Sequence, residues 1–387
     1  MIKIKKIIVN VCLLIPIAII AIISKFKSIN ISILDTDRIG HMCLLDYYLA
    51  KKKYYNLKSI DIVGYNKKSE NTYLIGLYKK KIILLSNYKL IFWLCYSLNY
   101  WFKKNNIVNK FDINNIIYTK LTKKTFSISI DNDLYIKKLL EKFNLDPNKK
   151  FICIHNRDSL YLKKTYPGIN FSYHDNRNFK ISNMELAANY FVNNNYNVIR
   201  LGSVTEESTN SPHIFDYPNT VFNSRKNDLY LLENLSFYFG SDSGILLLAP
   251  LFRKSFSFVN FTRIDGLFKT YYWNNLPSIF KIMINSETKI PLTLNEIYKN
   301  NFDQLILSHH LTENNIELVD NSPKDILSLA KEVLSIYENK NSYKERDEIN
   351  HFMDISKSYG RVTNGPMPIS NNLISNTFLK NNNFLLK

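Results

Sequence analysis

The chain has 387 residues, of which 45% are hydrophobic and 22% charged, with 10 glycines and 11 prolines. These values exclude a wholly disordered, collagen-like or coiled-coil protein and leave room for two or three globular domains. Lys and Arg total 51 against 33 Asp and Glu, and the net charge of +18 favours an anionic partner such as a nucleic acid, a membrane or a phosphorylated small molecule. The four cysteines lie in apolar runs without zinc or redox spacing, so we expect reduced, buried thiols.

The first predicted element is a membrane anchor within residues 1–28. Ile7 to Ile23 carry no charge and approach the length that spans a bilayer. No small-residue cleavage site follows, so a retained anchor is expected rather than a cleaved signal, and a pair of buried core strands is the alternative. A second apolar stretch, residues 79–104, is rich in aromatic residues between lysine clusters. Its pattern fits either a helix at the headgroup level of a membrane or a core helix.

Strands and helices alternate after this anchor. Ile29 to Leu34 are predicted to form a strand that ends at Asp35-Thr36-Asp37, and a helix follows from about His41. The break at Asp146-Pro147 predicts the end of a first domain, residues 29–147. Further strands in this domain are expected at residues 60–63, 73–77 and 82–85.

The second predicted domain, residues 148–345, repeats the alternation. Ser182 to Glu185 have the spacing of a capping box that opens a helix, and Ser322 to Asp325 are expected to cap a second helix. The alternation predicts the α/β class with a parallel sheet in each domain. Strands are expected at residues 151–155, 196–201, 237–239, 256–259 and 316–319, short helices at 228–235 and 244–251, and a helical tail at 346–387.

Polar residues follow several of the predicted strands. Ligands of open α/β sheets bind beyond the carboxyl ends of the strands, so these residues predict a ligand-binding cleft between the two domains. They comprise Asp35 to His41, Asn156 to Ser159, Gly202 to Glu206 and Gly240 to Gly244.

The loop from Ser241 to Gly244 is the best predicted phosphate site. It leads into a helix, whose first amides can bind an anion together with the hydroxyls of Ser241 and Ser243. Asp242 would repel a phosphate, so we expect it to hold loop amides or a ribose hydroxyl. A simple helix cap is the alternative interpretation of the loop.

Arg157 is the best candidate to neutralise a diphosphate, because a guanidinium can donate paired hydrogen bonds to phosphate oxygens. Arg177 and Ser203, which also follow predicted strands, complete the expected donor site. A structural ion pair between Arg157 and Asp158 is the alternative.

Two Asp-x-Asp sequences match a pattern by which some glycosyltransferases hold a divalent metal. They are Asp35-Thr36-Asp37 and Asp131-Asn132-Asp133. The first follows the earliest strand and the second opens a helix, so we expect neither to bind a metal.

Several segments together resemble a family of bacterial glycosyltransferases encoded in surface-polysaccharide gene clusters. The segments are RIGHMCLLDYYL, FICIHNRDSLYL, YHDNRNF, YNVIRLGS, FYFGSDSG and SNTFLKNNNFLL. The GSDSG loop also resembles the donor-phosphate loop of heptosyltransferases, although Leu247 or Leu248 stands where those enzymes carry a histidine. The HNRD stretch is similar to the donor motif of fucosyltransferases that use GDP-fucose. The resemblance implies a GT-B fold: two Rossmann-like domains facing a cleft, a donor held mainly by the second, no essential metal or cofactor, and a tail that crosses back to the first.

The leading hypothesis is a glycosyltransferase that moves a sugar from a nucleotide diphosphate donor to a surface-polysaccharide or lipid-linked acceptor. His41 is the first candidate for the catalytic base and Asp158 the second. We expect the enzyme at the inner membrane, in contact with anionic lipid, with its catalytic domain on the cytoplasmic side. Another polysaccharide-modifying transferase, such as a pyruvyl transferase, and a non-catalytic membrane-bound carbohydrate-binding protein are the alternatives. Dispersed lysines and the lack of a known module argue against nucleic acid.

Overall fold

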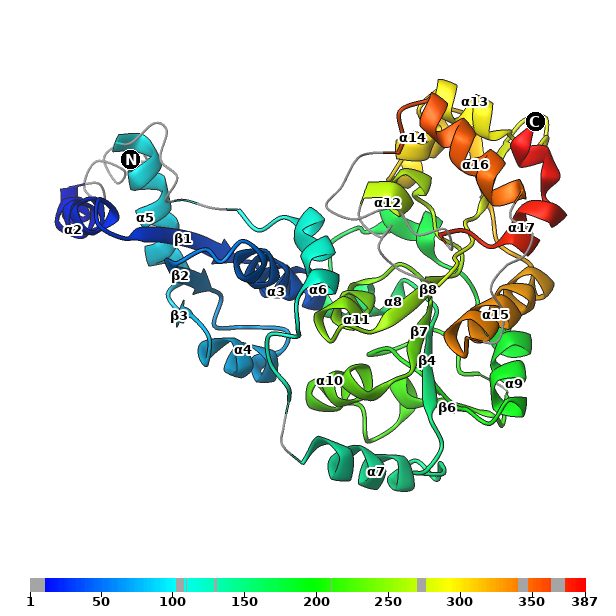
Figure 1. Ribbon diagram of the computed structural model, residues 1–387, viewed down its shortest axis with the longest axis horizontal. Coiled ribbons are helices and arrows are strands. Elements are labelled where there is room, and N and C mark those ends of the chain that lie inside the picture. Colours follow the sequence, from blue (N-terminus) through cyan, green and yellow to red (C-terminus); the bar gives the residue numbers. More distant parts are fainter. Residues whose placement is uncertain are drawn as a thin grey trace. The chain divides into compact units, whose positions relative to one another are not determined.

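The computed structural model describes residues 11–101, 108, 110–128, 131–209, 211–269, 276–339, 347–362 and 373–387. The chain divides into two compact units, Met1–Ile128 and Ser129–Lys387, which Figure 1 shows as ribbons. The division falls before α7 (Asn132–Lys142), not after Pro147 as predicted. The reason is that α7 packs on the second unit: Tyr135 Oη donates to Asn227 Oδ1 at 2.7 Å.

The first unit is built on a three-stranded parallel sheet in the order β1-β2-β3. Its strands are β1 (Ser28–Leu34), β2 (Ser59–Tyr65) and β3 (Ile83–Leu85). Besides α2 (Leu14–Ser24), the described residues of this unit form helices α3 (Ile39–Tyr54), α4 (Thr72–Lys79), α5 (Tyr88–Trp101) and α6 (Tyr118–Leu121), the last preceded by the 3-10 turn η1 (Ile113–Ile117).

One strand prediction in this unit is wrong. Residues 73–77 belong to helix α4, because the side chain of Asn71 caps it by accepting from Leu74 N at 2.8 Å. Leu74, Leu77 and Tyr78 are buried at helical spacing. The apolar run TYLIGLYK fits both the two-residue period of a strand and the 3.6-residue period of a helix, and tertiary packing decides between them.

The predicted membrane anchor is not supported. Helix α2 (Leu14–Ser24) has 11 residues, and in the part of the chain that the structure describes no helix combines the length and apolarity needed to cross a bilayer. Leu13, Ile17 and Ile20 are buried against residues of β1 and α5 that include Ile31 and Leu98. The described part of the expected span therefore packs on the core of the first unit, and residues 7–10 lie outside the described residues.

The second unit holds a five-stranded parallel sheet in the order β6-β5-β4-β7-β8. The central strand β4 (Phe151–His155) is buried along its whole length, as continuous apolar strands of parallel sheets are. The sequence predicted four of these strands and missed the three-residue β6. The others are β5 (Asn197–Arg200), β6 (Ile214–Asp216), β7 (Phe237–Gly240) and β8 (Ser255–Phe258).

The two helix starts predicted in the second unit, at Ser182 and Ser322, have different outcomes. The capping box of Ser322 and Asp325 is present and opens α15 (Pro323–Tyr337), which packs against α9 (Glu185–Asn193). The predicted box at Ser182 is absent, because Ser182 lies inside the 3-10 turn η3 (Ile181–Met184) rather than at an N-cap. The predicted helix 244–251 is a 3-10 turn, η5 (Gly244–Leu247), followed by one α-helical turn, α11 (Leu248–Leu251).

The C-terminal part belongs to the second unit. Strand β10 (Ile316–Val319) pairs antiparallel with β9 (Ile282–Asn285), and helix α17 (Asn376–Asn381) contacts α15 and α16 (Asp347–Ser358). The described tail therefore packs against its own unit. The remaining helices are α8 (Leu160–Thr165), α10 (Arg225–Asn234), α12 (Ile264–Lys269), α13 (Leu294–Lys299) and α14 (Ser308–Glu313), and the remaining 3-10 turns are η2 (Ser172–Arg177), η4 (Tyr217–Asn219), η6 (Phe302–Gln304) and η7 (Asn383–Leu386).

Candidate active site

The strand order of the second unit defines where a ligand would bind. The chain passes from β4 to β5 and β6 on one side of the sheet and returns to β7 and β8 on the other. The loops after β4 and β7 therefore diverge, and the crevice at such a switch point is the usual ligand site of open α/β sheets. The β4 loop begins at Asn156 and Arg157, and the β7 loop contains Ser241 to Ser243.

Gly240 allows the two strands to meet closely at this point. It pairs with His155, and a Cβ atom on residue 240 would lie 2.2 Å from the His155 carbonyl oxygen. The amide of Ser241 then donates to that oxygen at 2.8 Å. The close approach places the imidazole of His155 beside the serine hydroxyls, with Nδ1 2.8 Å from Ser241 Oγ and 3.4 Å from Ser243 Oγ.

His155 is a neutral part of the site. Burial, assisted by the positive charges of Arg200, Arg157 and Arg177, lowers the pKa of its imidazole from 6.5 to about 3. The ring therefore fixes the two serine hydroxyls without adding a charge at neutral pH.

Arg157 has a buried guanidinium whose hydrogen-bond donors are only partly used. Its Nη1 donates to His174 O at 3.0 Å and to Asn178 Oδ1, while its Nε and Nη2 bond to none of the residues that the structure describes. Among those residues no carboxylate forms an ion pair with it, so the structural pair with Asp158, the alternative interpretation, is not formed. Burial lowers the pKa of Arg157 to about 10, and the side chain still carries its charge at neutral pH.

A second buried cation, Lys281, lies next to Arg157. Its Nζ donates to Asn178 O at 2.9 Å and pairs with Asp320 Oδ1 at 2.7 Å, so Asn178 bonds to both cations. Burial lowers the pKa of Lys281, and the charge of Arg157 acts in the same direction. Two cationic side chains therefore meet at Asn178, one of them, Lys281, already paired with a carboxylate.

The loop after β7 presents free amides. The N–H groups of Asp242, Ser243 and Gly244 make no hydrogen bond within the described part of the chain. Asp242 accepts from Arg177 with its main-chain oxygen, and its Oδ1 lies 3.4 Å from Arg177 Nη2. Arg177 is therefore held across the loop, and the carboxylate of Asp242 is turned to the arginine.

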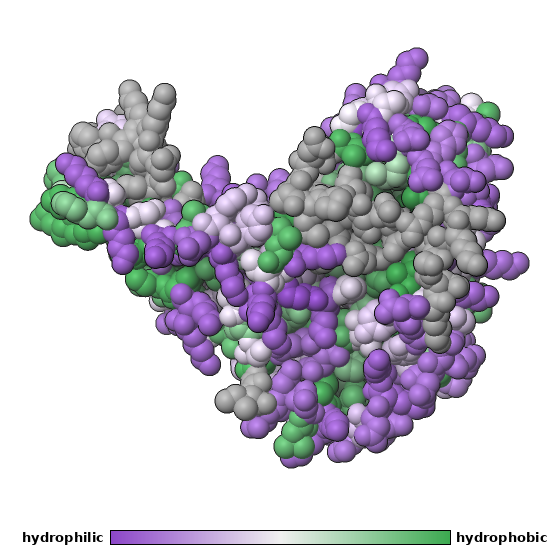
Figure 2. Space-filling model, in the orientation of Figure 1, coloured by the Kyte–Doolittle hydropathy of each residue, from purple (hydrophilic) through white to green (hydrophobic). Residues whose placement is uncertain are grey.

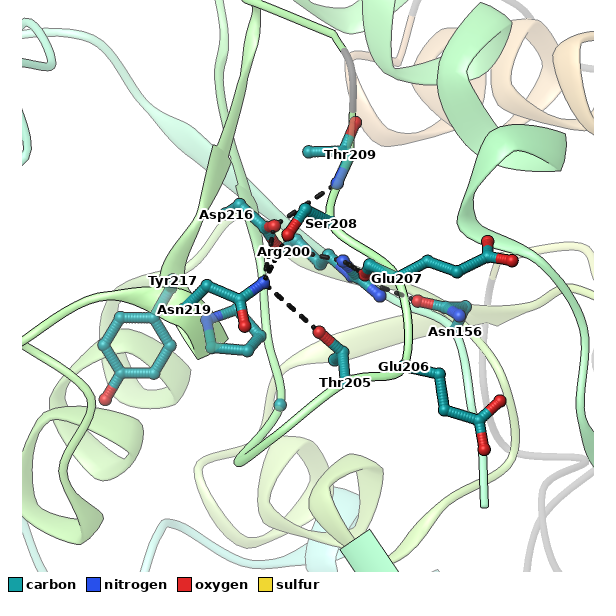
Figure 3. Close-up of polar contacts among 12 residues, drawn as sticks. Asn156, Arg200, Thr205, Glu206, Glu207, Ser208, Thr209, Asp216, Tyr217 and Asn219 are labelled. Carbon is teal, nitrogen blue, oxygen red and sulfur yellow. Dashed lines mark hydrogen bonds and ion pairs between the residues drawn. The ribbon is translucent and has the colours of Figure 1, made fainter. Parts of the chain in front are cut away.

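The loop after β5 is fixed by a buried arginine, as Figure 3 shows. Arg200 is fully buried and donates to Asn156 Oδ1 at 3.1 Å, to Glu207 O at 2.6 Å and to Asp216 Oδ1 at 3.0 Å. Asn219 donates to Asp216, Thr205 and Ser208, and so closes the loop on itself. These bonds tie the loop after β5 to Asn156, which follows the central strand β4.

Two predicted site residues have other partners. Asp158 accepts the amides of Leu160 and Glu206 at 3.0 Å each, so it ties the β4 loop to the β5 loop, and burial raises its pKa. Ser203 Oγ accepts from Arg225 and its carbonyl from Asn223. Neither contact brings these side chains to the amides of residues 242–244.

The carboxyl end of β1, in the first unit, holds an exposed acid–histidine pair. Asp35 Oδ2 lies 2.6 Å from His41 Nδ1, and Asp35 Oδ1 accepts the Asp37 amide at 3.0 Å. The hydrogen bond from His41 lowers the pKa of Asp35. A carboxylate that accepts the Nδ1 proton leaves Nε2 as the basic nitrogen, the arrangement that a general base needs.

The Asp-x-Asp sequences do not gather metal ligands. Asp35 is engaged with His41, and Asp131 is the N-cap residue of α7. Within the described ranges, no group of three or more His, Cys, Asp or Glu side chains is placed to hold a metal ion.

Sequence reasoning missed Lys281 and Asn178 as members of the site, and it gave His155 no role beyond its place in the HNRD stretch. His155 is the last residue of an apolar strand, where a packing role is expected. Lys281 was detectable only as a single cation between the apolar residues Phe280 and Ile282. Asn178 lies in the polar segment 173–178 that was predicted to touch ligand, but nothing in its spacing distinguishes it from its neighbours.

Comparison with known proteins gives distant likenesses. No protein-family model and no curated protein matches the chain. It is similar to the solved structures of a glycosyl transferase family 9 protein from Veillonella parvula (10% identity, 80% of this chain, 97% of that chain, TM-score 0.45) and of the iron-containing dodecameric glycosyltransferase TibC from enterotoxigenic E. coli (11%, 81%, 77%, 0.39). A third is the ADP-heptose lps heptosyltransferase II of E. coli (12%, 59%, 84%, 0.34). All three are glycosyltransferases by name.

Proposed function

We propose that the protein is a glycosyltransferase that uses a nucleotide diphosphate sugar as donor. The observation that carries the proposal is the buried guanidinium of Arg157 at the switch point, which lacks a carboxylate partner among the described residues. The carboxylates of Asp175, Asp242 and Asp158 act on this charge without forming an ion pair with it, and a bound diphosphate would pair with it directly. The free amides of residues 242–244 offer further donors on the neighbouring strand.

The chemistry follows from this charge distribution. Transfer of the sugar leaves a nucleotide diphosphate, and fixed cations and amides stabilise the negative charge that develops on it. Arg157, Arg177 and the 242–244 amides fill this role, while neutral His155 keeps Ser241 and Ser243 oriented. The protein forms no covalent bond in this scheme.

The acceptor hydroxyl loses a proton if the reaction inverts the anomeric centre. His41 is the proposed base, with Asp35 as the residue that sets its tautomer. Asp158 is less suited, because both its oxygens already accept loop amides.

The proposal also covers the acceptor, the metal requirement and the cellular location. The acceptor is a surface polysaccharide or a lipid-linked glycan. Catalysis requires no metal, since cationic side chains and amides serve the diphosphate. The protein acts at the cytoplasmic side of the inner membrane, because nucleotide sugars are made in the cytosol and unpaired cysteines such as Cys153 suit a reducing compartment.

Nucleotide binding tests the proposal directly. Thermal shift with a panel of nucleotide diphosphates and their sugars identifies the nucleotide, and calorimetry then measures its affinity. Arg157→Ala should weaken binding by about tenfold to 150-fold, which corresponds to roughly 1.5–3 kcal/mol for a charge-assisted hydrogen bond.

Lys289→Ala is the matched control, because it also removes one positive charge but from an exposed pair with Glu317. It should leave the affinity unchanged. Equal affinities of wild type and Arg157→Ala, or no stabilisation by any nucleotide in the panel, would contradict the proposal.

A further inference from the structure

Helix α2 has one buried face and one exposed face, although both are apolar. Ile17 and Ile20 pack into the core of the first unit, while Ile15 is 74% exposed and Ile19 51%. In Figure 2 the area that Figure 1 labels α2 is strongly hydrophobic (green). The exposed members of this face are Val11, Leu14, Ile15, Ile19, Ile22, Ile23 and Phe26.

Helix α5 extends the apolar surface. It contacts α2 through the shared core cluster of Ile91, Leu94, Cys95 and Leu98. Its outward residues Leu90, Phe92 and Tyr100 are exposed, and Phe92 packs edge-on against Trp93. The exposed apolar residues of these two contacting helices lie in one part of the first unit, and such a concentration marks an interaction site.

The charges around this surface indicate the partner. Lys25 and Lys27 follow α2, Lys89 lies in the first turn of α5, and all three are exposed. Residues 1–34 and 79–101 contain no Asp or Glu. Apolar helices with flanking lysines and no acidic residue in their own segments match the acyl and phosphate layers of an anionic bilayer. A second copy of the chain would place like charges against each other.

We propose that the exposed faces of α2 and α5 form a docking surface by which the first unit lies on an anionic lipid bilayer, with α2 in the membrane plane rather than across it. The packing of Leu13, Ile17 and Ile20 on β1 and α5 fixes α2 to its unit, so only its outer half is available to lipid. This inference does not depend on the proposed function, because it concerns binding of lipid and not catalysis.

Vesicle co-sedimentation of the full chain tests the proposal, with phosphatidylcholine vesicles that contain or lack phosphatidylglycerol. The double variant Ile15→Asp, Ile19→Asp should lose more than about tenfold in vesicle affinity, because it places charge on the inserted face. Ile169→Asp with Ile290→Asp is the matched control: both isoleucines are exposed apolar residues of the second unit, and binding should not change. Lys25→Gln with Lys27→Gln should weaken binding only to the anionic vesicles.

The mode of binding is tested by extraction. Alkaline carbonate should release the wild-type protein from anionic vesicles, because in-plane docking leaves no segment across the bilayer. Retention of the protein after carbonate treatment would overturn the proposal. So would unchanged vesicle binding by the Ile15, Ile19 double variant, provided that this variant keeps the native thermal unfolding profile. A lipid-free dimer of the wild type that the double variant dissociates would also overturn it.

Discussion

The substitution Gly240→Ala probes the contact on which the candidate active site is built. The added Cβ would lie 2.2 Å from the His155 carbonyl oxygen and 2.7 Å from its nitrogen. Carbon–oxygen contacts in proteins begin near 3.3 Å, so β4 and β7 would have to separate by roughly 1 Å. Both atoms belong to the backbone of the central strand, and neither can rotate away.

The cost has two parts. Overpacking in a rigid interior costs about 1–3 kcal/mol, and losing the bond from Ser241 N to His155 O leaves buried polar groups that cost about 1–3 kcal/mol more. We therefore expect the second unit to lose about 4 kcal/mol of unfolding free energy, measured by urea denaturation. The variant should also bind nucleotide more weakly, because the loop from Ser241 to Gly244 would be displaced.

The control is Gly76→Ala, since nothing lies within 4 Å of a Cβ at that position in α4. It should stabilise the first unit by about 0.5–1 kcal/mol. If Gly240→Ala unfolds at the same urea concentration as the wild type, with the same slope, the close approach of β4 and β7 is not a structural requirement and the reasoning fails.

Three further predictions concern protons and metal. Because folding lowers the pKa of His155 from 6.5 to about 3, the unfolded chain binds its proton first as the pH falls, and this residue should reduce the unfolding free energy by about 1.4 kcal/mol per pH unit between those values. His155→Gln should therefore give a flatter acid limb of the stability profile, and an unchanged limb would contradict the burial of a neutral ring. Asp35→Asn should change the tautomer of His41, read from its side-chain 15N shifts, and lower turnover nearly as much as His41→Ala; an unchanged tautomer would mean that Asp35 does not orient the ring. Turnover should continue in excess EDTA, and loss of activity that manganese restores would establish a metal requirement.

Much of the second sheet could be predicted from the sequence because its strands are short apolar runs bounded by polar residues. Phe151 to His155 and Phe237 to Gly240 are clear examples, and their ends led directly to Arg157 and Ser241. The same approach failed for residues 73–77, whose apolar spacing suits two periods, and for β6, which has only three residues. Local pattern is sufficient where burial covers both faces of a strand and insufficient where packing chooses the period.

The electrostatic character of the site could not be predicted to the same extent. The neutral state of His155 depends on burial and on Arg200, Arg157 and Arg177, of which only Arg157 is near it in the sequence. Asn178 bonds to both Arg157 and Lys281, which lie far apart in the sequence of the second unit. Such contacts arise from the register of β4 with β7 and from the path of the chain after β8. The local spacing of residues predicts neither.

The sideways packing of α2 has a practical consequence for producing the protein. A hydrophobic segment at the start of a chain is commonly removed to improve solubility. Here its removal would uncover Ile31, Ile91 and Leu98, which α2 helps to cover. A truncated chain that starts near Ser28 would lose the exposed apolar face of α2 but would expose apolar core residues in its place. It should therefore aggregate more readily than the full chain in mild detergent.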